Sequence, residues 1–135
     1  MIKISKKAQY GLRAMVHLAK QYKTGKICSA KKISEKEGIP FDFLEKIIRQ
    51  LSDVGLVKGR KGFQGGYMLS RSPVKVTAKD IVSVLENPPA GGKKPVVNCA
   101  LCQRKNKCPT KNVWEKVETA LYKTLERITL ADLIK

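Results

Sequence analysis

Apolar residues recur every three to four positions in the N-terminal part of the chain and predict two amphipathic helices. The first covers residues 5–22, with Ser5 placed to cap its N terminus. The second is short and covers residues 30–37, between Ser29 as its cap and Gly38 as its C-terminal stop.

A third helix is predicted over residues 41–53, and Gly55 closes it. The apolar side chains that share its expected inner face are Phe43, Leu44, Ile47, Ile48 and Leu51. Residues 56–72 then predict two short strands around a glycine-bearing loop. Two helices joined by a tight turn and followed by a hairpin are the winged helix-turn-helix order, in which helix 41–53 recognises DNA.

The C-terminal half predicts two more helices. Thr77 and Asp80 have the spacing of a capping box, which starts a helix over residues 78–86. A long helix is expected over residues 111–128, and its apolar stripe is Val113, Val117, Leu121, Leu125 and Ile128. The fold class is therefore mainly α with a small β-hairpin wing.

The charge of the chain indicates a polyanionic partner. It has 28 lysines and arginines against 11 aspartates and glutamates, a net charge of +17. Such an excess destabilises a compact state by self-repulsion and is typical of proteins that bind nucleic acid, although solubility or heat adaptation also favours lysine. We find no apolar run of membrane-spanning length and no signal peptide, so we expect a cytoplasmic protein that does not bind a membrane.

Polar side chains of the expected recognition helix and wing are candidates for DNA contact. On the helix, Glu45 can accept from a cytosine amine and Arg49 can pair with guanine or phosphate, unless the two form a surface ion pair. The full set of candidates is Glu45, Lys46, Arg49, Gln50, Lys58, Arg60, Lys61 and Gly62.

Three cysteines, Cys99, Cys102 and Cys108, fall within ten residues of one another and are candidate metal ligands. Thiolates are the usual ligands of iron–sulfur clusters, which we prefer here. Zinc is a lesser possibility because it needs four ligands and only three are local, and a metal-free thiol switch is the third. The single histidine and the lack of an acid–base pair near the thiols argue against an enzyme.

Three segments of the chain resemble the IscR-type family of winged-helix transcriptional regulators, to which IscR, NsrR and CymR belong, and are most similar to IscR. They are 9-QYGLRAMVHLA-19, 39-IPFDFLEKIIRQLSDVGLVKGRKGFQGGYMLSRSP-73 and the late cysteine cluster before a long helix. The resemblance implies a homodimer whose C-terminal helices cross and whose wings and recognition helices bind the two halves of a palindromic operator.

The resemblance also implies functions for individual residues. Cys99, Cys102 and Cys108 would hold an iron–sulfur cluster, 2Fe–2S by analogy. Glu45 would discriminate between promoter classes, and Lys61 lies near the position of a wing arginine that contacts a groove.

The cysteine segment departs from the family pattern in two ways. Cys102 and Cys108 keep the family's gap of five residues, but Cys99 lies closer to Cys102, and Lys111 stands where the family has a histidine. The fourth cluster ligand is therefore open, and the candidates elsewhere in the chain are His17, Cys28 and Gln9.

The expected function is a cluster-sensing repressor of iron–sulfur cluster assembly genes. The alternative is a metal-free winged-helix regulator that responds to thiol redox state or to a partner enzyme of cysteine metabolism. The expected division is a DNA-binding domain over residues 1–86, a cluster-binding loop over 87–110 and a dimerisation helix over 111–135.

Overall fold

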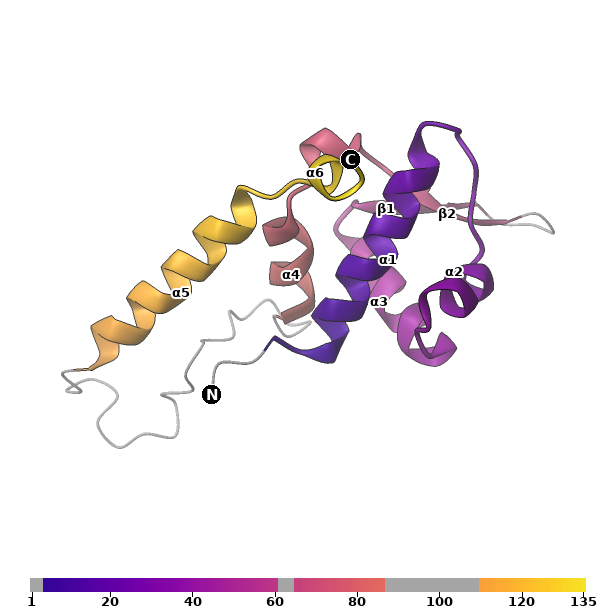
Figure 1. Ribbon diagram of the computed structural model, residues 1–135. Helices are drawn as coiled ribbons and strands as arrows, with labels where there is room; N and C mark the ends of the chain where they lie inside the picture. The colour runs from indigo at the N-terminus through magenta and orange to yellow at the C-terminus, as the bar shows by residue number, and fades with distance from the viewer. Residues whose placement is uncertain (1–3, 61–64, 87–109) are drawn as a thin grey trace.

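The computed structural model of the chain describes residues 4–60, 65–86 and 110–135. It confirms a mainly helical fold with one two-stranded hairpin after the third helix (Figure 1). The elements in order are α1 Lys6–Tyr22, α2 Ala30–Glu37, α3 Phe41–Asp53, β1 Val57–Arg60, β2 Gly66–Leu69, the 3-10 turn η1 Pro73–Lys75, α4 Ala78–Glu86, α5 Lys111–Glu126 and α6 Leu130–Leu133. None of the described helices combines the length and apolar character that a membrane crossing needs.

Local capping explains where the first helices begin and end. The Ser5 hydroxyl accepts from the backbone N–H of Ala8, and the Ser29 hydroxyl accepts from Lys32. Gly38 ends α2 in the left-handed conformation, with φ of 65°. These caps satisfy backbone groups that the helix cannot pair internally, which is why both helices lie where the sequence predicts them.

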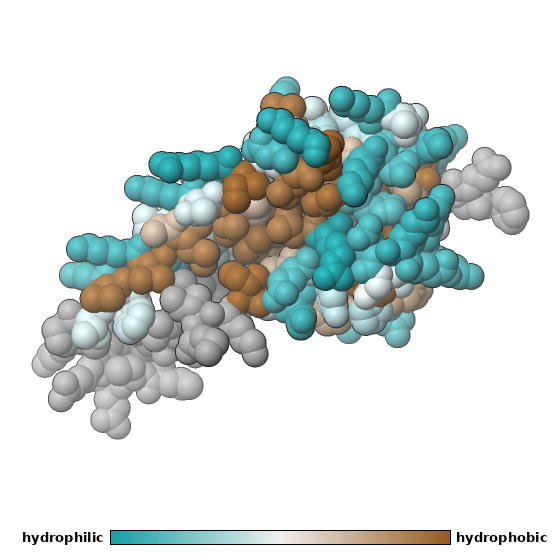
Figure 2. Space-filling view, in the orientation of Figure 1, coloured by the Kyte–Doolittle hydropathy of each residue, from teal (hydrophilic) through white to brown (hydrophobic). Residues whose placement is uncertain are grey.

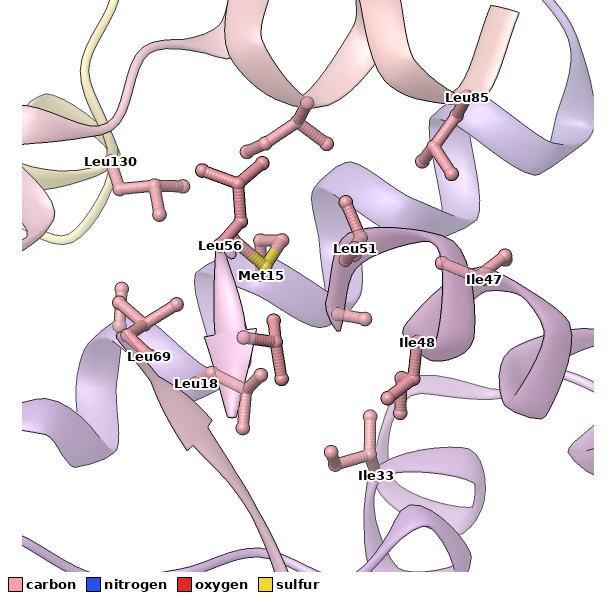
Figure 3. Packing of buried hydrophobic residues seen from close by; sticks show 14 of the residues in the cluster. Met15, Leu18, Ile33, Ile47, Ile48, Leu51, Leu56, Leu69, Leu85 and Leu130 are labelled. Carbon is pink, nitrogen blue, oxygen red and sulfur yellow. The ribbon is translucent and has the colours of Figure 1, made fainter. Parts of the chain in front are cut away.

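Helix α1 lies at the centre of the core. Met15 and Leu18 of α1, Ile48 and Leu51 of α3 and Leu69 of β2 are all at most 2% exposed and form one cluster (Figure 3). This burial fixes which face of α3 points outward, because its apolar stripe is held against α1.

The wing is an antiparallel hairpin that is anchored to the body of the protein at its base. In the register, Val57 pairs with Leu69 and Arg60 with Gly66. A bridge then ties Tyr67 to Cys28, which precedes α2: the Cys28 N–H donates to the Tyr67 carbonyl at 3.0 Å and the Tyr67 N–H donates to the Cys28 carbonyl at 2.7 Å. The wing is thus hydrogen-bonded to the helix-turn-helix and not only joined to it along the chain.

The C-terminal helices contact the rest of the protein through α6, and α5 also packs against α4. Leu130 is completely buried in the core, and its N–H donates to the Val76 carbonyl at 2.9 Å. The Ile128 carbonyl accepts from Ala78, the first residue of α4, at 2.7 Å. The predicted capping box of Thr77 with Asp80 is present. The long helix ends at Glu126, two residues earlier than predicted, since the chain turns there to bring Leu130 into the core.

Candidate nucleic-acid interface and thiol centre

The polar candidates on α3 lie away from its buried face. Glu45, Lys46 and Arg49 are exposed, whereas Leu44, Ile47, Ile48 and Leu51 are buried. Gln50 is half-buried at the edge, and its Oε1 atom is enclosed without a hydrogen-bond partner within the described part of the chain. The helix therefore presents the basic groups of Lys46 and Arg49 to solvent, together with the carboxylates of Asp42, Glu45 and Asp53. Gln50 is less accessible than its sequence position indicates.

The wing carries two further exposed basic residues on β1, a strand that contacts α3. Lys58 and Arg60 are exposed, and because they are two residues apart on β1 their side chains leave one face of the strand. Lys61 and Gly62 lie outside the described residues. An open hollow lies between the wing, the start of α2 and the end of α3. It is lined by Ser29, Ala30, Ser52, Gly59, Arg60, Gly65, Gly66 and Tyr67.

These basic side chains keep their charge available for a ligand. Within residues 4–60, 65–86 and 110–135, neither Lys46 nor Arg49 on α3 forms an ion pair, and the same holds for Lys58 and Arg60 on the wing. The surface pair of Glu45 with Arg49, which helical spacing allows, is therefore not formed. Four cations without an acidic partner in this part of a basic protein favour an anionic ligand such as the DNA backbone.

Phe43 does not lie on the inner face of α3, and the sequence expectation was wrong at this residue. Its side chain is 37% exposed. The ring packs edge-on against Tyr10 of α1 with the centroids 5.5 Å apart, and the Arg13 guanidinium lies 5.5 Å from the Tyr10 centroid on that ring's face. Phe43 falls at the border of the apolar stripe, where periodicity alone does not decide between burial and the surface.

A second centre, formed by Cys28, His17 and Glu37, lies inside the DNA-binding body. Cys28 is 2% exposed and His17 is 7% exposed. The Cys28 Sγ atom is 3.6 Å from Nε2 of His17, and Nδ1 of the same ring is 2.8 Å from Oε1 of Glu37. A thiol, an imidazole and a carboxylate in this order form a chain in which the carboxylate orients the ring and the ring is placed to exchange a proton with sulfur.

The sequence suggested His17 and Cys28 as alternative fourth ligands of a cluster, and it gave no indication that they contact each other or that Glu37 joins them. The three come from α1, the segment before α2 and the last residue of α2, so only packing brings them together. A weak signal was present, because His17 lies between the buried Ala14 and Leu18 on the inner face of α1. Both ring nitrogens of His17 have contacts within the protein, Nδ1 with Glu37 and Nε2 with Cys28.

Cys99, Cys102 and Cys108 lie outside the described residues, so the cluster assignment stays a prediction. Among the described residues, no group of three histidine, cysteine, aspartate or glutamate side chains is arranged to hold a metal ion. Within the described residues, the Cys28 centre is a thiol in contact with an imidazole that is hydrogen-bonded to a carboxylate.

Comparison with known proteins identifies the family of this winged helix-turn-helix. The model of the Rrf2 family, described as an iron-dependent transcriptional regulator, matches residues 4–135. The chain belongs to the Rrf2 family. It is therefore a DNA-binding transcriptional regulator and not an enzyme, which confirms the resemblance to IscR-type proteins.

Individual regulators and solved structures of the Rrf2 family match over almost the whole chain. The regulator CymR of Bacillus subtilis is 33% identical over 132 residues, covering 98% of this chain and 89% of the relative. The solved structure of T. potens IscR has 37% identity and a TM-score of 0.77, with 98% of this chain and 85% of that chain covered. The oxidised form of Staphylococcus aureus CymR has 29% identity and a TM-score of 0.75, with 98% and 96% covered.

Proposed function

We propose that this Rrf2-family protein binds a palindromic operator as a homodimer and represses iron–sulfur cluster assembly genes, and that an iron–sulfur cluster sets its affinity. The observation that carries the DNA-binding half is the surface formed by α3 and the wing. It presents Lys46, Arg49, Lys58 and Arg60 without acidic partners among the described residues, on a chain with a net charge of +17.

The homodimer is supported by an apolar stripe on α5 that the chain itself leaves partly uncovered. Val113 is 50% exposed and Trp114 37% exposed, and Val117, Leu121 and Leu125 continue the stripe half-buried toward the body. Figure 2 shows apolar residues running along α5 and onto the body of the molecule. A second copy of the same helix would cover this stripe, and two-fold pairing matches a palindromic site. A Trp114→Glu variant should sediment as a monomer and lose operator affinity, whereas Glu115→Gln on the same turn should do neither.

The donor chemistry of the cysteine segment fits an iron–sulfur cluster, with Cys99, Cys102 and Cys108 as the thiolate ligands. When bound, the cluster supplies a redox-sensitive centre whose loss changes the charge and order of the segment that holds it. Of the candidates for the fourth ligand, His17 and Cys28 are buried and engaged with each other. Gln9 is exposed, and its Nε2 atom donates to the Ile4 carbonyl at 2.8 Å. It lies one turn from Ser5, which is hydrogen-bonded to Glu86 at the end of α4. We therefore assign Gln9 as the accessible candidate.

The residues at both ends of the cysteine segment connect it to the DNA-binding body. At one end, the Glu86 carboxylate accepts from the backbone N–H and the hydroxyl of Ser5 at 2.8 and 2.6 Å, at the start of α1. At the other end, α5 leads into α6, whose Leu130 is packed in the core. A change of order in the segment would act on α1 and α4, which pack against α3, and coupling energies of about 1–3 kcal/mol are typical of such linkage.

The test is to load the protein with iron and sulfide without oxygen, and to measure its visible spectrum, its iron and sulfide content and its dissociation constant for a selected operator. We expect a coloured protein, and an affinity that differs between loaded and metal-free forms. Cys99→Ala, Cys102→Ala and Cys108→Ala should each lose the colour, whereas Cys28→Ala, the matched control, should keep it. A colourless protein that binds the operator fully would refute the cluster proposal and leave operator binding intact.

The Cys28 centre supports a second candidate function, which is regulation by thiol oxidation; the relative CymR of Staphylococcus aureus has itself been crystallised in an oxidised form. The Cys28 sulfur would attack one oxygen of hydrogen peroxide, forming an S–O bond as the O–O bond breaks, and the released hydroxide would take the thiol proton by way of His17. The products are a sulfenic acid and water, so that sulfur is oxidised by two electrons and peroxide is reduced. Cys28 is 2% exposed and its backbone is bridged to Tyr67 of the wing, so an oxygen added to its sulfur would act on this bridge.

Peroxide treatment of the metal-free protein distinguishes the two candidates. Under thiol regulation, wild type gains one oxygen at Cys28, shown by mass spectrometry, and loses operator affinity. Cys28→Ala should keep its affinity, and Glu37→Gln should slow the oxidation. Unchanged operator binding by wild type with Cys28 fully oxidised would rule this candidate out.

A further inference from the structure

The first turn of α3 carries a large apolar side chain that lies outside the buried core. Phe41 is the first residue of the helix and is 43% exposed. It is not one of the buried residues of the core. Phe43 differs, since its ring lies against Tyr10. A large part of the Phe41 surface therefore stays available to a ligand.

Phe41 has a defined position relative to the polar face of α3. Glu45 follows four residues later, so the two side chains lie on the same edge of the helix, about 6 Å apart along its axis. Phe43 points to the opposite edge, toward α1. The N-terminal turn of a recognition helix is the part that meets base edges in the major groove, and no side-chain cap covers this end of α3.

The chemistry of this edge selects pyrimidines. Thymine presents a 5-methyl group in the major groove, which apolar side chains contact, and cytosine presents an amine that a glutamate accepts. We propose that Phe41 is a specificity-determining residue that contacts the methyl group of a thymine. This thymine would lie about two base-pair steps from the cytosine whose amine donates to the Glu45 carboxylate. This inference rests on the proposed binding of α3 to an operator and does not depend on the iron–sulfur cluster.

The test begins with selection of operators from random duplex DNA by the full-length protein. Each thymine of the selected half-site is then replaced by deoxyuridine, which removes only the methyl group, and dissociation constants are measured. We expect wild type to bind about fourfold more weakly at one thymine near the selected cytosine, which corresponds to about 0.8 kcal/mol for one buried methyl-sized group.

Variants assign the effect to one side chain. Phe41→Ala should bind the thymine and deoxyuridine operators equally, and Phe41→Leu should keep part of the preference. Phe43→Ala, the matched control from the same turn, should keep the full preference. Unfolding midpoints should agree between wild type and Phe41→Ala because the side chain is outside the core.

Two results overturn the inference. Equal affinity of wild type for thymine and deoxyuridine at every position would show that no methyl contact exists. A preference that survives in Phe41→Ala would assign the contact to another residue. A protein that enriches no sequence would remove operator recognition by α3 as well, so the two failures are distinguishable.

Discussion

Replacing Gly66 by alanine tests the connection between the wing and the helix-turn-helix. A Cβ atom at this position would lie 2.6 Å from both the carbonyl carbon and the carbonyl oxygen of Cys28 and 2.7 Å from Cγ2 of Ile27. Real Cβ contacts with backbone are essentially never this short, so either the wing or the Cys28 segment has to move. Gly66 does not have a positive φ, so the effect comes from the contact and not from backbone conformation.

The size of the effect follows from what holds the two segments together. Two backbone hydrogen bonds, at 3.0 and 2.7 Å, join Cys28 to Tyr67, next to Gly66. Their loss costs about 0.5–1.5 kcal/mol each, and overpacking without full relaxation adds about 1–3 kcal/mol. Lower entropy of the unfolded chain offsets roughly 0.4–1 kcal/mol of this. We expect the free energy of unfolding to fall by about 3 kcal/mol, within a range of roughly 1–6 kcal/mol.

Urea unfolding, monitored by far-ultraviolet circular dichroism, measures this change in stability. Operator titration measures how much DNA affinity is lost when the wing is displaced. Gly59→Ala is the matched control in the same hairpin. Its added Cβ would lie 3.2 and 3.3 Å from atoms of the Tyr67 ring, which can move, and 3.7 Å from the Gly66 carbonyl oxygen, which is an ordinary contact distance. If both variants unfold at the same urea concentration, the close approach at Gly66 does not stabilise the protein and the reasoning fails.

Three further predictions concern the C-terminal junction and the DNA surface. Leu130→Ala should lower the free energy of unfolding by about 3 kcal/mol, because it leaves a cavity where α6 enters the core; a change under about 1 kcal/mol in urea unfolding would show that α6 is not anchored there. The hydrogen bond from the backbone N–H of Thr129 holds the pKa of Asp132 below its ordinary value. The ionised carboxylate therefore stabilises the fold at pH values above the ordinary carboxyl pKa, and this contribution is lost as the pH falls through the lowered pKa. Carboxyl NMR titration checks the direction, and Asp132→Asn should remove that part of the acid dependence of stability. Arg49→Ala should reduce discrimination at one base pair by about 1–3 kcal/mol. Lys58→Ala should lower the affinity for all DNA sequences alike and reduce the slope of log affinity against log salt concentration by about 0.9. Equal losses of affinity for operator and random DNA in Arg49→Ala would identify Arg49 as a phosphate contact.

The helices and the hairpin could be predicted from the sequence because the signals for them are local. Ser5, Ser29 and Thr77 each cap a helix through hydrogen bonds that span three residues, and the structure has all three. The exposed positions of Glu45, Lys46 and Arg49 follow from the same periodicity that buries Leu44 and its neighbours. Cys99, Cys102 and Cys108, as well as Lys61 and Gly62, lie outside the described residues, and their functions stay predictions.

Contacts between distant parts of the chain were decided only by the tertiary structure. Periodicity gave Phe43 an inner position, but packing turned it toward Tyr10 at the surface, since a residue at the border of an apolar stripe is placed by its neighbours. The alignment of Cys28 with His17 and Glu37 depends on how α2 crosses α1, and the anchoring of the wing depends on the bridge from Tyr67 to Cys28. A linear pattern specifies which residues prefer to be buried, because burial preference is a property of each side chain and its spacing. Which buried groups meet is specified only when the helices pack, because that depends on the shapes of all the surfaces brought together.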